Sequence, residues 1–511
     1  MFERQPSPPW FDVRALLPEW PGILPVWADR QSATPAYLRE LGHTKRFLER
    51  WTADARFRAA FAEDADAACT RWGLHADPEA IQQLWDQELA AANDPRSADA
   101  PAPVLQHRAF HVEKSLFVDE LQNRRCAPDE PDFRRWRERQ IRRCSSELGL
   151  LKSARTVHAP VCFELAEGCS VGCWFCGVAA PDLGDLFLRT PGNRQVWRDT
   201  LEVVGDLLGP AAGHGFLYWA SDPFDNPDYE DLLLDFANIF GTWPQTTTAL
   251  AARQLERAHA LVELSHRRGG FGDRFSLLSV RELDRVHERF TPTELVFTEL
   301  VMQNKQSIEG RKANAGRARL TFARRAARAA STGQVVPEAP ADASTIACVS
   351  GFLISMVRKT VRLISPCSAS ERWPLGYIQY EEAAFTDARD LGRVMRRLIA
   401  DYMTPYVRGR DRLGFRSNLE FRASDAGFEL VSPHVEQRFG ASRLTRRVGE
   451  LLEAGGAPAA DIADRLQLEL GVEPAEVFHT LNQLLEASVL DETLRIPPKL
   501  TMRTPGNWVA P

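Results

Sequence analysis

The sequence predicts a mixed α/β protein: an open, partial (β/α)6 barrel between a helical N-terminal domain and a winged-helix-like C-terminal domain. Over 155–435, short apolar runs alternate with amphipathic helical stretches, which is typical of βαβ units and a parallel sheet. Residues 1–150 show helical periodicity, and 440–500 have the pattern of three short helices and a small hairpin. These observations predict three domains with the stated boundaries.

Composition supports a globular chain and excludes several protein classes. The 511 residues include 63 Lys and Arg against 69 Asp and Glu, a net charge of −6, and 44% are hydrophobic. We therefore expect no nucleic-acid partner. No apolar run reaches the roughly 18–20 residues of a membrane helix, and no secretory signal is visible. Nine cysteines are too few for a disulfide framework, which favours a reducing, cytoplasmic location.

The N-terminal domain is expected to be helical throughout. Apolar residues recur near the 3.6-residue period over 44–85, with a break at Gly73 and a linker at 93–103. A charged amphipathic helix is expected over 134–151.

The central domain is expected to contain six strands separated by helices. The predicted strands are 161–165, 215–220, 246–251, 274–280, 294–301 and a weaker one at 345–352. The predicted helices are 194–208, 228–240, 254–268 and 280–289. In such a barrel the functional loops follow the C-terminal ends of the strands.

The C-terminal domain is expected to contain helices at 443–454, 459–470 and 475–487, with a hairpin at 489–496 as the wing. Gly455, Gly456 and Gly471 mark the ends of the first two helices, because glycine is favoured just after a helix C-terminus.

Three cysteines carry the strongest chemical signal. Cys169, Cys173 and Cys176 have the spacing C-x3-C-x2-C and follow the predicted strand 161–165. A [4Fe–4S] cluster normally takes four thiolates, so three ligands on one loop leave one iron open. A zinc site is the alternative, but no fourth Cys or His stands at a suitable spacing.

The motif resembles that of the radical S-adenosylmethionine (SAM) superfamily, with Phe175 at the aromatic position. The resemblance implies a radical SAM barrel, a [4Fe–4S] cluster, SAM bound at the open iron and Phe175 near the adenine. Ser221 and Asp222 occupy the place of the stretch that binds the SAM amino group, and Ser279 is a possible ribose contact. The alternatives are a turn and N-cap before Asp228, and a serine that merely ends a strand.

Within that superfamily, residues 163–177 resemble the proteusin-type epimerases that mature ribosomally made peptides. The resemblance implies an enzyme that converts L- to D-residues in a precursor peptide, reduced by an electron donor of the flavodoxin or ferredoxin type. Other radical SAM peptide modifications, such as thioether or carbon–carbon crosslinking, stay open. So does a non-catalytic iron–sulfur protein that binds peptides or senses redox state.

Inversion at Cα requires a hydrogen atom returned from the opposite face, and a thiol is the best protein donor. Cys367 follows a strand-like run and a proline, in a loop of small polar residues. It is therefore expected at an exposed position at the barrel mouth, and the epimerase resemblance assigns it the donor role. The alternative is a buried free cysteine, the usual environment of this residue.

Three segments are candidate partner-binding regions. The C-terminal domain loosely resembles modules that bind leader peptides, although a structural cap on the barrel is an equal alternative. Residues 44–85 loosely resemble the helical leaders of Nif11-type precursors, with a plain helical domain as the alternative. From Arg311 to Arg328 the chain is basic without an acid, either as a solvated helix face or as a site for an acidic leader or a reductase.

Overall fold

A computed structural model describes residues 23, 26–27, 33–94, 97–270, 272–310, 312–332, 345–425, 427–440 and 442–496. The chain forms two compact units, each built from more than one segment. The first comprises Met1–Leu121, Asp222–Phe224 and Gln245–Arg311. The second comprises Gln122–Ser221, Asp225–Pro244 and Lys312–Pro511. The molecule is of the mixed α/β class, and none of its small sheets closes into a barrel within the described residues.

The first unit begins with helices whose starts are set by capping residues. Thr34 accepts a hydrogen bond from the N–H of Tyr37, and Pro35 takes the first helical position, where its missing N–H costs nothing. The helices are α1 (Pro35–Ala53), α2 (Ala55–Glu63), α3 (Ala65–Arg71), α4 (Gln82–Trp85), α5 (Gln87–Ala92) and α6 (Ala102–Glu120). Phe47 and Phe57 are fully buried in an aromatic core within 44–85. The expected break occurs at Gly73, where φ is +63°.

The same unit contains a small parallel sheet. Its strands are β2 (Thr247–Thr248), β3 (Asp273–Leu277) and β4 (Thr298–Met302), in that order. Helices α11 (Leu255–Arg267) and α12 (Val280–Arg289) connect them. The strands predicted at 246–251, 274–280 and 294–301 are thus present but shorter, and the helices at 254–268 and 280–289 are confirmed.

The second unit is built on a mixed four-stranded sheet of order β1-β5-β6-β7. Its strands are β1 (Ala159–Glu164), β5 (Val349–Ser355), β6 (Thr360–Pro366) and β7 (Tyr377–Ala384). β1 and β5 are parallel, whereas β6 and β7 add antiparallel neighbours. The weak sixth strand predicted at 345–352 therefore corresponds to β5, but it pairs with the first strand.

The strand predicted at 215–220 is replaced by a single bridge. Phe216 pairs in parallel with Cys162, and the N–H of Phe163 donates to the carbonyl of Phe216. The backbone then leaves the extended region, because Ala220 has a φ of +49°. The prediction of a full strand here was wrong.

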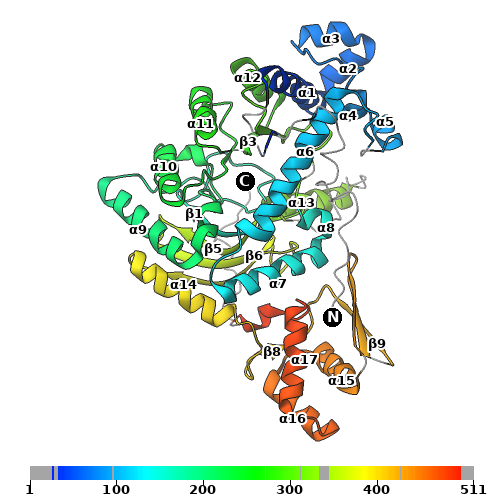
Figure 1. The fold of residues 1–511 in the computed structure, drawn as a ribbon, viewed down its shortest axis with the longest axis vertical. Coiled ribbons are helices and arrows are strands. Elements are labelled where there is room, and N and C mark those ends of the chain that lie inside the picture. Colours follow the sequence, from blue (N-terminus) through cyan, green and yellow to red (C-terminus); the bar gives the residue numbers. More distant parts are fainter. Residues whose placement is uncertain are drawn as a thin grey trace. The chain divides into compact units, whose positions relative to one another are not determined.

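Helices cover one face of the four-stranded sheet (Figure 1). They include α7 (Pro131–Leu148), α9 (Pro191–Leu208) and α14 (Ala388–Tyr402). Phe133 of α7 packs against Phe352 with ring centroids 5.4 Å apart, and Trp197 of α9 packs against Phe163 at 4.9 Å. On the opposite face Glu164 and Arg362 form an ion pair, with 2.5 Å between oxygen and nitrogen.

Three further helices complete the central part of this unit, namely α8 (Leu150–Ser153), α10 (Tyr229–Phe240) and α13 (Gly316–Thr332). The helices predicted at 134–151, 194–208 and 228–240 are confirmed by α7 with α8, by α9 and by α10. No helix in the described part of the chain has the length and apolar character needed to span a membrane.

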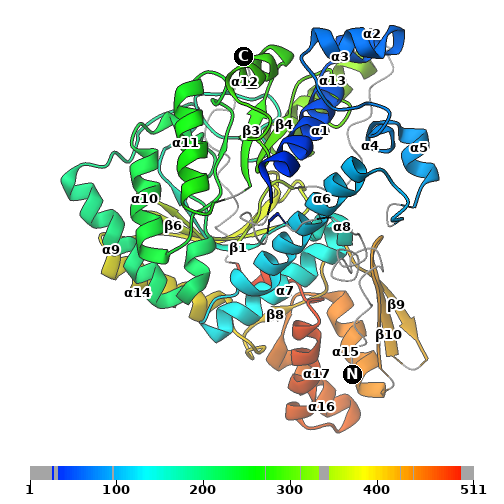
Figure 2. The ribbon, with the colours of Figure 1, turned by 45° about the horizontal axis from the view of Figure 1, so that its top comes forward.

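The C-terminal region joins three helices to a small antiparallel sheet (Figure 2). The helices α15 (Arg443–Ala454), α16 (Ala459–Leu470) and α17 (Pro474–Glu486) match the prediction. The sheet has the order β11-β10-β9 and comes before them, with strands β9 (Glu420–Ser424), β10 (Gly427–Val431) and β11 (Glu436–Phe439).

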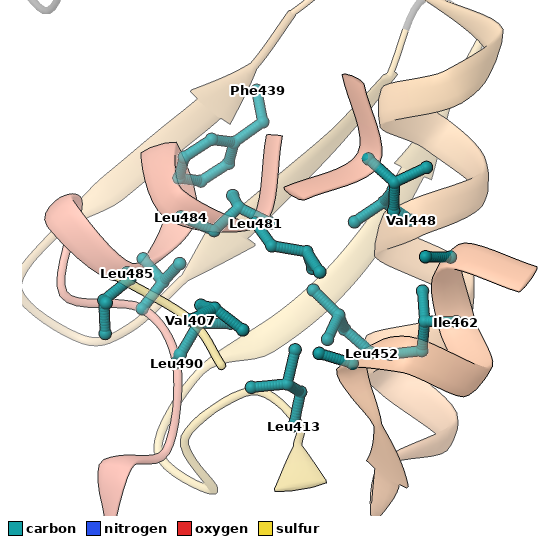
Figure 3. Close-up of a cluster of buried hydrophobic side chains, with 14 of the residues drawn as sticks. Val407, Leu413, Phe439, Val448, Leu452, Ile462, Leu481, Leu484, Leu485 and Leu490 are labelled. Atoms are coloured by element: carbon teal, nitrogen blue, oxygen red, sulfur yellow. The ribbon is translucent and has the colours of Figure 1, made fainter. Parts of the chain in front are cut away.

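The hairpin predicted at 489–496 was wrong. Leu490 forms one bridge with Phe415, and Glu492–Arg495 is a 3₁₀ helix, η7. A two-stranded ladder joins β8 (Arg412–Leu413) to β12 (Ala457–Pro458). The core extends from Val407 and Leu413 to Leu490 (Figure 3), so it takes residues from both sides of the predicted boundary at 435–440.

Candidate functional site

The three motif cysteines lie on one loop that leaves the C-terminal end of β1. Each thiol is half-buried, and none of the three is in a disulfide. Gly168 and Gly172, on either side of Cys169, have φ values of +80° and +64°, a conformation that glycine adopts without strain. At Gly168 a Cβ would also lie 2.1 Å from the carbonyl oxygen of Asp182. The glycines therefore turn the chain so that the cysteines follow one another along a compact loop.

Hydrogen bonds within the loop fix its shape. The N–H of Cys169 donates to the carbonyl of Pro181 at 3.0 Å, and that of Cys176 donates to Cys173 at 3.2 Å. The N–H of Ala180 donates to the sulfur of Cys176 at 3.3 Å. Amide donors directed at sulfur stabilise a thiolate, and they are one of the ways in which proteins tune iron–sulfur clusters.

The start of α13 packs tightly on this loop. Gly316 has a φ of +54°, and a Cβ there would lie 2.3 Å from the carbonyl oxygen of Gly177 and 2.6 Å from that of Cys176. The N–H of Arg317 donates to the Cys176 carbonyl at 2.9 Å, and its guanidinium donates to that of Cys173 at 3.0 Å. Sequence reasoning missed both positions, although the basic run that begins at Arg311 was a signal. Arg311 itself lies outside the described residues.

We expect Gly316→Ala to deform the cysteine loop. The left-handed backbone costs a non-glycine residue about 1–2 kcal/mol, and the added carbon also overlaps two carbonyl oxygens. Gly241→Ala is the matched control, because Gly241 has a φ of +70° with nothing within 4 Å of a Cβ. Both variants should unfold at lower temperature, but only Gly316→Ala should lose iron on anaerobic reconstitution. Equal iron contents would contradict this role.

Aromatic rings and cations surround the loop. The Lys312 ammonium lies 4.3 Å from the ring centre of Phe175, and the Arg325 guanidinium lies 4.7 Å from that of Trp174. Trp174 also contacts Phe322 edge-on at 6.0 Å. Burial lowers the pKa of Lys312 to about 8, against an opposing effect of Cys173. The half-buried Phe175, expected beside an adenine, thus already has a cation against its ring.

Among the described residues, no three His, Cys, Asp or Glu side chains are placed to hold a metal ion. Thiolates with an amide N–H directed at sulfur, as at Cys176, are the ligand type that an iron–sulfur cluster takes.

Asp222 and Ser279 have structural roles in the first unit. Asp222 is 4% exposed and accepts hydrogen bonds from the Phe224 N–H at 3.0 Å, the Thr248 hydroxyl at 2.7 Å and the Ala249 N–H at 2.6 Å. Ser279 caps α12 by accepting from the N–H of Glu282. Asp222 therefore takes part in a turn, in line with the turn alternative, whereas Ser279 caps a helix and does not merely end a strand. Ser221 is half-buried in the second unit, and the SAM contacts stay predictions.

We expect Asp222→Asn to lower the free energy of unfolding by about 1–3 kcal/mol, because an amide nitrogen cannot accept the hydrogen bonds that one carboxylate oxygen receives. Ser279→Ala, which removes a helix cap, should cost about 1 kcal/mol. Urea unfolding measures both changes. A loss of SAM affinity at unchanged stability would contradict the structural role of Asp222.

Cys367 is buried, so the expectation of an exposed position was wrong. It is 3% exposed, because the end of β6 is held against α7. The carbonyl of Pro366 accepts from the Arg143 guanidinium at 2.6 Å and from the Cys144 thiol at 3.2 Å. Burial, followed by the charge of Glu147, raises the pKa of Cys367 well above its ordinary value. The thiol therefore keeps its hydrogen at neutral pH.

Cys348 is a further thiol outside the cysteine loop. It is half-buried. It packs against the apolar cluster around Cys162 and Leu353, and Val178, which follows the cysteine loop, packs there too.

The chain is similar to one curated protein over nearly its full length. It is 35% identical over 472 residues to "Uncharacterized protein y4wI" of Sinorhizobium fredii, covering 90% of this chain and 89% of that protein. No family model matches the chain, and no solved structure matches it. On this likeness, the chain belongs to the same family as y4wI.

Proposed function

We propose that the protein is a radical SAM enzyme that epimerises amino-acid residues in a ribosomally made precursor peptide. The observation that carries the proposal is the loop with three half-buried cysteines, none of them in a disulfide, at the end of a buried strand. The residues of that loop resemble those of the proteusin-type epimerases. Cys367, which lies outside the loop, would return the hydrogen atom that inversion at Cα requires.

In this proposal Cys169, Cys173 and Cys176 would hold a [4Fe–4S] cluster that leaves one iron open to SAM. When bound, the cluster would supply the electron for reductive cleavage of SAM, the source of the radical that abstracts the Cα hydrogen of a peptide residue. The loop contributes by fixing the three sulfurs through its glycine turns and by directing the Ala180 N–H at Cys176. Arg317 would hold the Cys173 and Cys176 carbonyls in place.

The proposal includes a partial (β/α)6 barrel as the fold. Strand β1, the Phe216 bridge and strands β2, β3, β4 and β5 follow one another along the chain. Helices α9, α10, α11, α12 and α13 come between them in the required alternation. The pairs β2–β3 and β3–β4 are parallel and join consecutive strands, as such a barrel requires, and Phe216 pairs in parallel with Cys162 of β1. The β1–β5 pair is also parallel, but it joins the first strand to the sixth, which an open barrel leaves apart.

The precursor peptide would dock on the C-terminal region. Strand β9 is an edge of the three-stranded sheet, and its residues are largely exposed. An edge strand offers backbone groups that can pair with an extended peptide. This supports a leader-binding role for the region that contains α15, α16 and α17.

The reaction is tested by anaerobic incubation with reductant, SAM and a precursor peptide in heavy water. We expect D-residues after hydrolysis, with deuterium at the inverted Cα, because the donor thiol exchanges with solvent. A product whose mass is lower by that of the lost hydrogen atoms would instead indicate a crosslink. Failure to form 5′-deoxyadenosine would favour a non-catalytic cluster protein.

A further inference from the structure

Helix α13 presents an uncompensated basic surface beside the cysteine loop. Its sequence contains five arginines and no acidic residue. Only Gly316, Ala318 and Ala329 are buried, while Arg324, Arg325 and Arg328 are exposed. No carboxylate of the described residues pairs with these three arginines. The helix thus carries a positive field although the whole chain has a net charge of −6.

This surface adjoins the cysteine loop. Gly316 packs on Cys176 and Gly177, and Arg325 lies over Trp174, which is the residue after Cys173. Leu320 is 42% exposed, and Phe322 contacts Trp174. Exposed Arg next to Trp and other apolar side chains is the composition that dominates binding energy in protein interfaces.

We propose that α13 and Trp174 form the docking surface for an acidic electron-transfer protein, which rests on the function proposed above. The cleavage of SAM consumes one electron, and reduced flavin proteins can give one electron by passing from hydroquinone to semiquinone. An electron-transfer protein bound on α13 would be separated from the cysteine loop by a single layer of side chains. Its negative charge would complement Arg324, Arg325 and Arg328, and such complementarity mainly speeds association and selects the partner.

The test measures the Kd of the full-length protein for an acidic flavodoxin. We expect R324E/R328E to weaken binding by about tenfold or more at roughly 0.01 M ionic strength, and the difference to shrink near 0.15 M, where charges are screened. The control is R389E/R396E, on exposed positions of α14, which changes the net charge equally. Thermal unfolding verifies that both variants fold.

A second readout separates docking from chemistry. With dithionite as reductant, the α13 variant should form 5′-deoxyadenosine at the wild-type rate, whereas flavodoxin-driven formation should fall. The protein could bind flavodoxin through α13 and yet be unable to cleave SAM. That result would support the docking surface and refute the proposed function. An unchanged Kd, an equal effect of the α14 variant, or a selective loss of precursor-peptide binding would overturn the docking proposal.

Discussion

Alanine at Cys169, Cys173 or Cys176 is expected to abolish cluster assembly and SAM cleavage. Changes to residues that merely support metal ligands cost about 10–100-fold, so removal of a direct ligand should cost more. Iron and sulfide content after anaerobic reconstitution should fall to background in each variant. Formation of 5′-deoxyadenosine should fall by more than about 100-fold.

Cys69→Ala is the matched control for these variants, because Cys69 is buried among the aromatic residues of the first unit. It should keep its iron and its activity. The folded state of the loop variants should survive, since the three thiols are only half-buried. A variant that retains a full cluster would show that its cysteine is not a ligand.

Cys367→Ala is expected to stop epimerisation while SAM cleavage continues. Without a returned hydrogen atom the Cα radical cannot become a D-residue, so 5′-deoxyadenosine accumulates without inverted product. The loss of one buried sulfur should also cost about 1–2 kcal/mol of stability. Chiral amino-acid analysis and nucleoside quantification on the same samples measure the two outcomes.

Two other thiols make this experiment decisive. Cys144 is also buried and contacts the same Pro366 carbonyl, so Cys144→Ala reproduces the packing loss without removing the proposed donor. It should still invert residues. Cys348→Ala tests the half-buried thiol outside the cysteine loop. Loss of inversion in Cys348→Ala, with Cys367→Ala active, would transfer the donor role to Cys348.

The pH dependence of inversion follows from the burial of Cys367. Hydrogen-atom return needs the protonated thiol, and burial raises the pKa of Cys367 well above its usual value. The donor form is therefore retained as pH rises through about 8.5, the ordinary cysteine range. Inversion per SAM cleaved should stay constant there, and a fall centred on that range would contradict a buried donor.

Helices could be predicted because their signals are local. The periodicity and the end glycines placed α15 and α16 at their observed bounds, and a serine cap starts α12 at the expected residue. The strands were harder to predict, because β2 has only two residues and its formation depends on pairing with β3. The prediction of a wing hairpin at 489–496 was wrong because Leu490 instead forms a bridge with Phe415, a residue far away in the sequence.

The cysteine loop was visible in the sequence because its spacing is local, but its surroundings were not. Gly316 and Arg317 reach the loop from about 140 residues further along the chain. Pro366, next to the buried Cys367, is bonded through its carbonyl by Arg143 and Cys144, over 220 residues earlier. A loop of small polar residues predicts exposure only when no distant helix packs on it.

The most direct measurement is the EPR spectrum of the reduced, anaerobically reconstituted protein before and after addition of SAM. A cluster held by Cys169, Cys173 and Cys176 alone has an iron to which SAM binds, so the signal should change on addition and the change should be lost in each alanine variant. Zinc in place of iron, or a cluster signal that SAM leaves unaltered, would contradict the central claim.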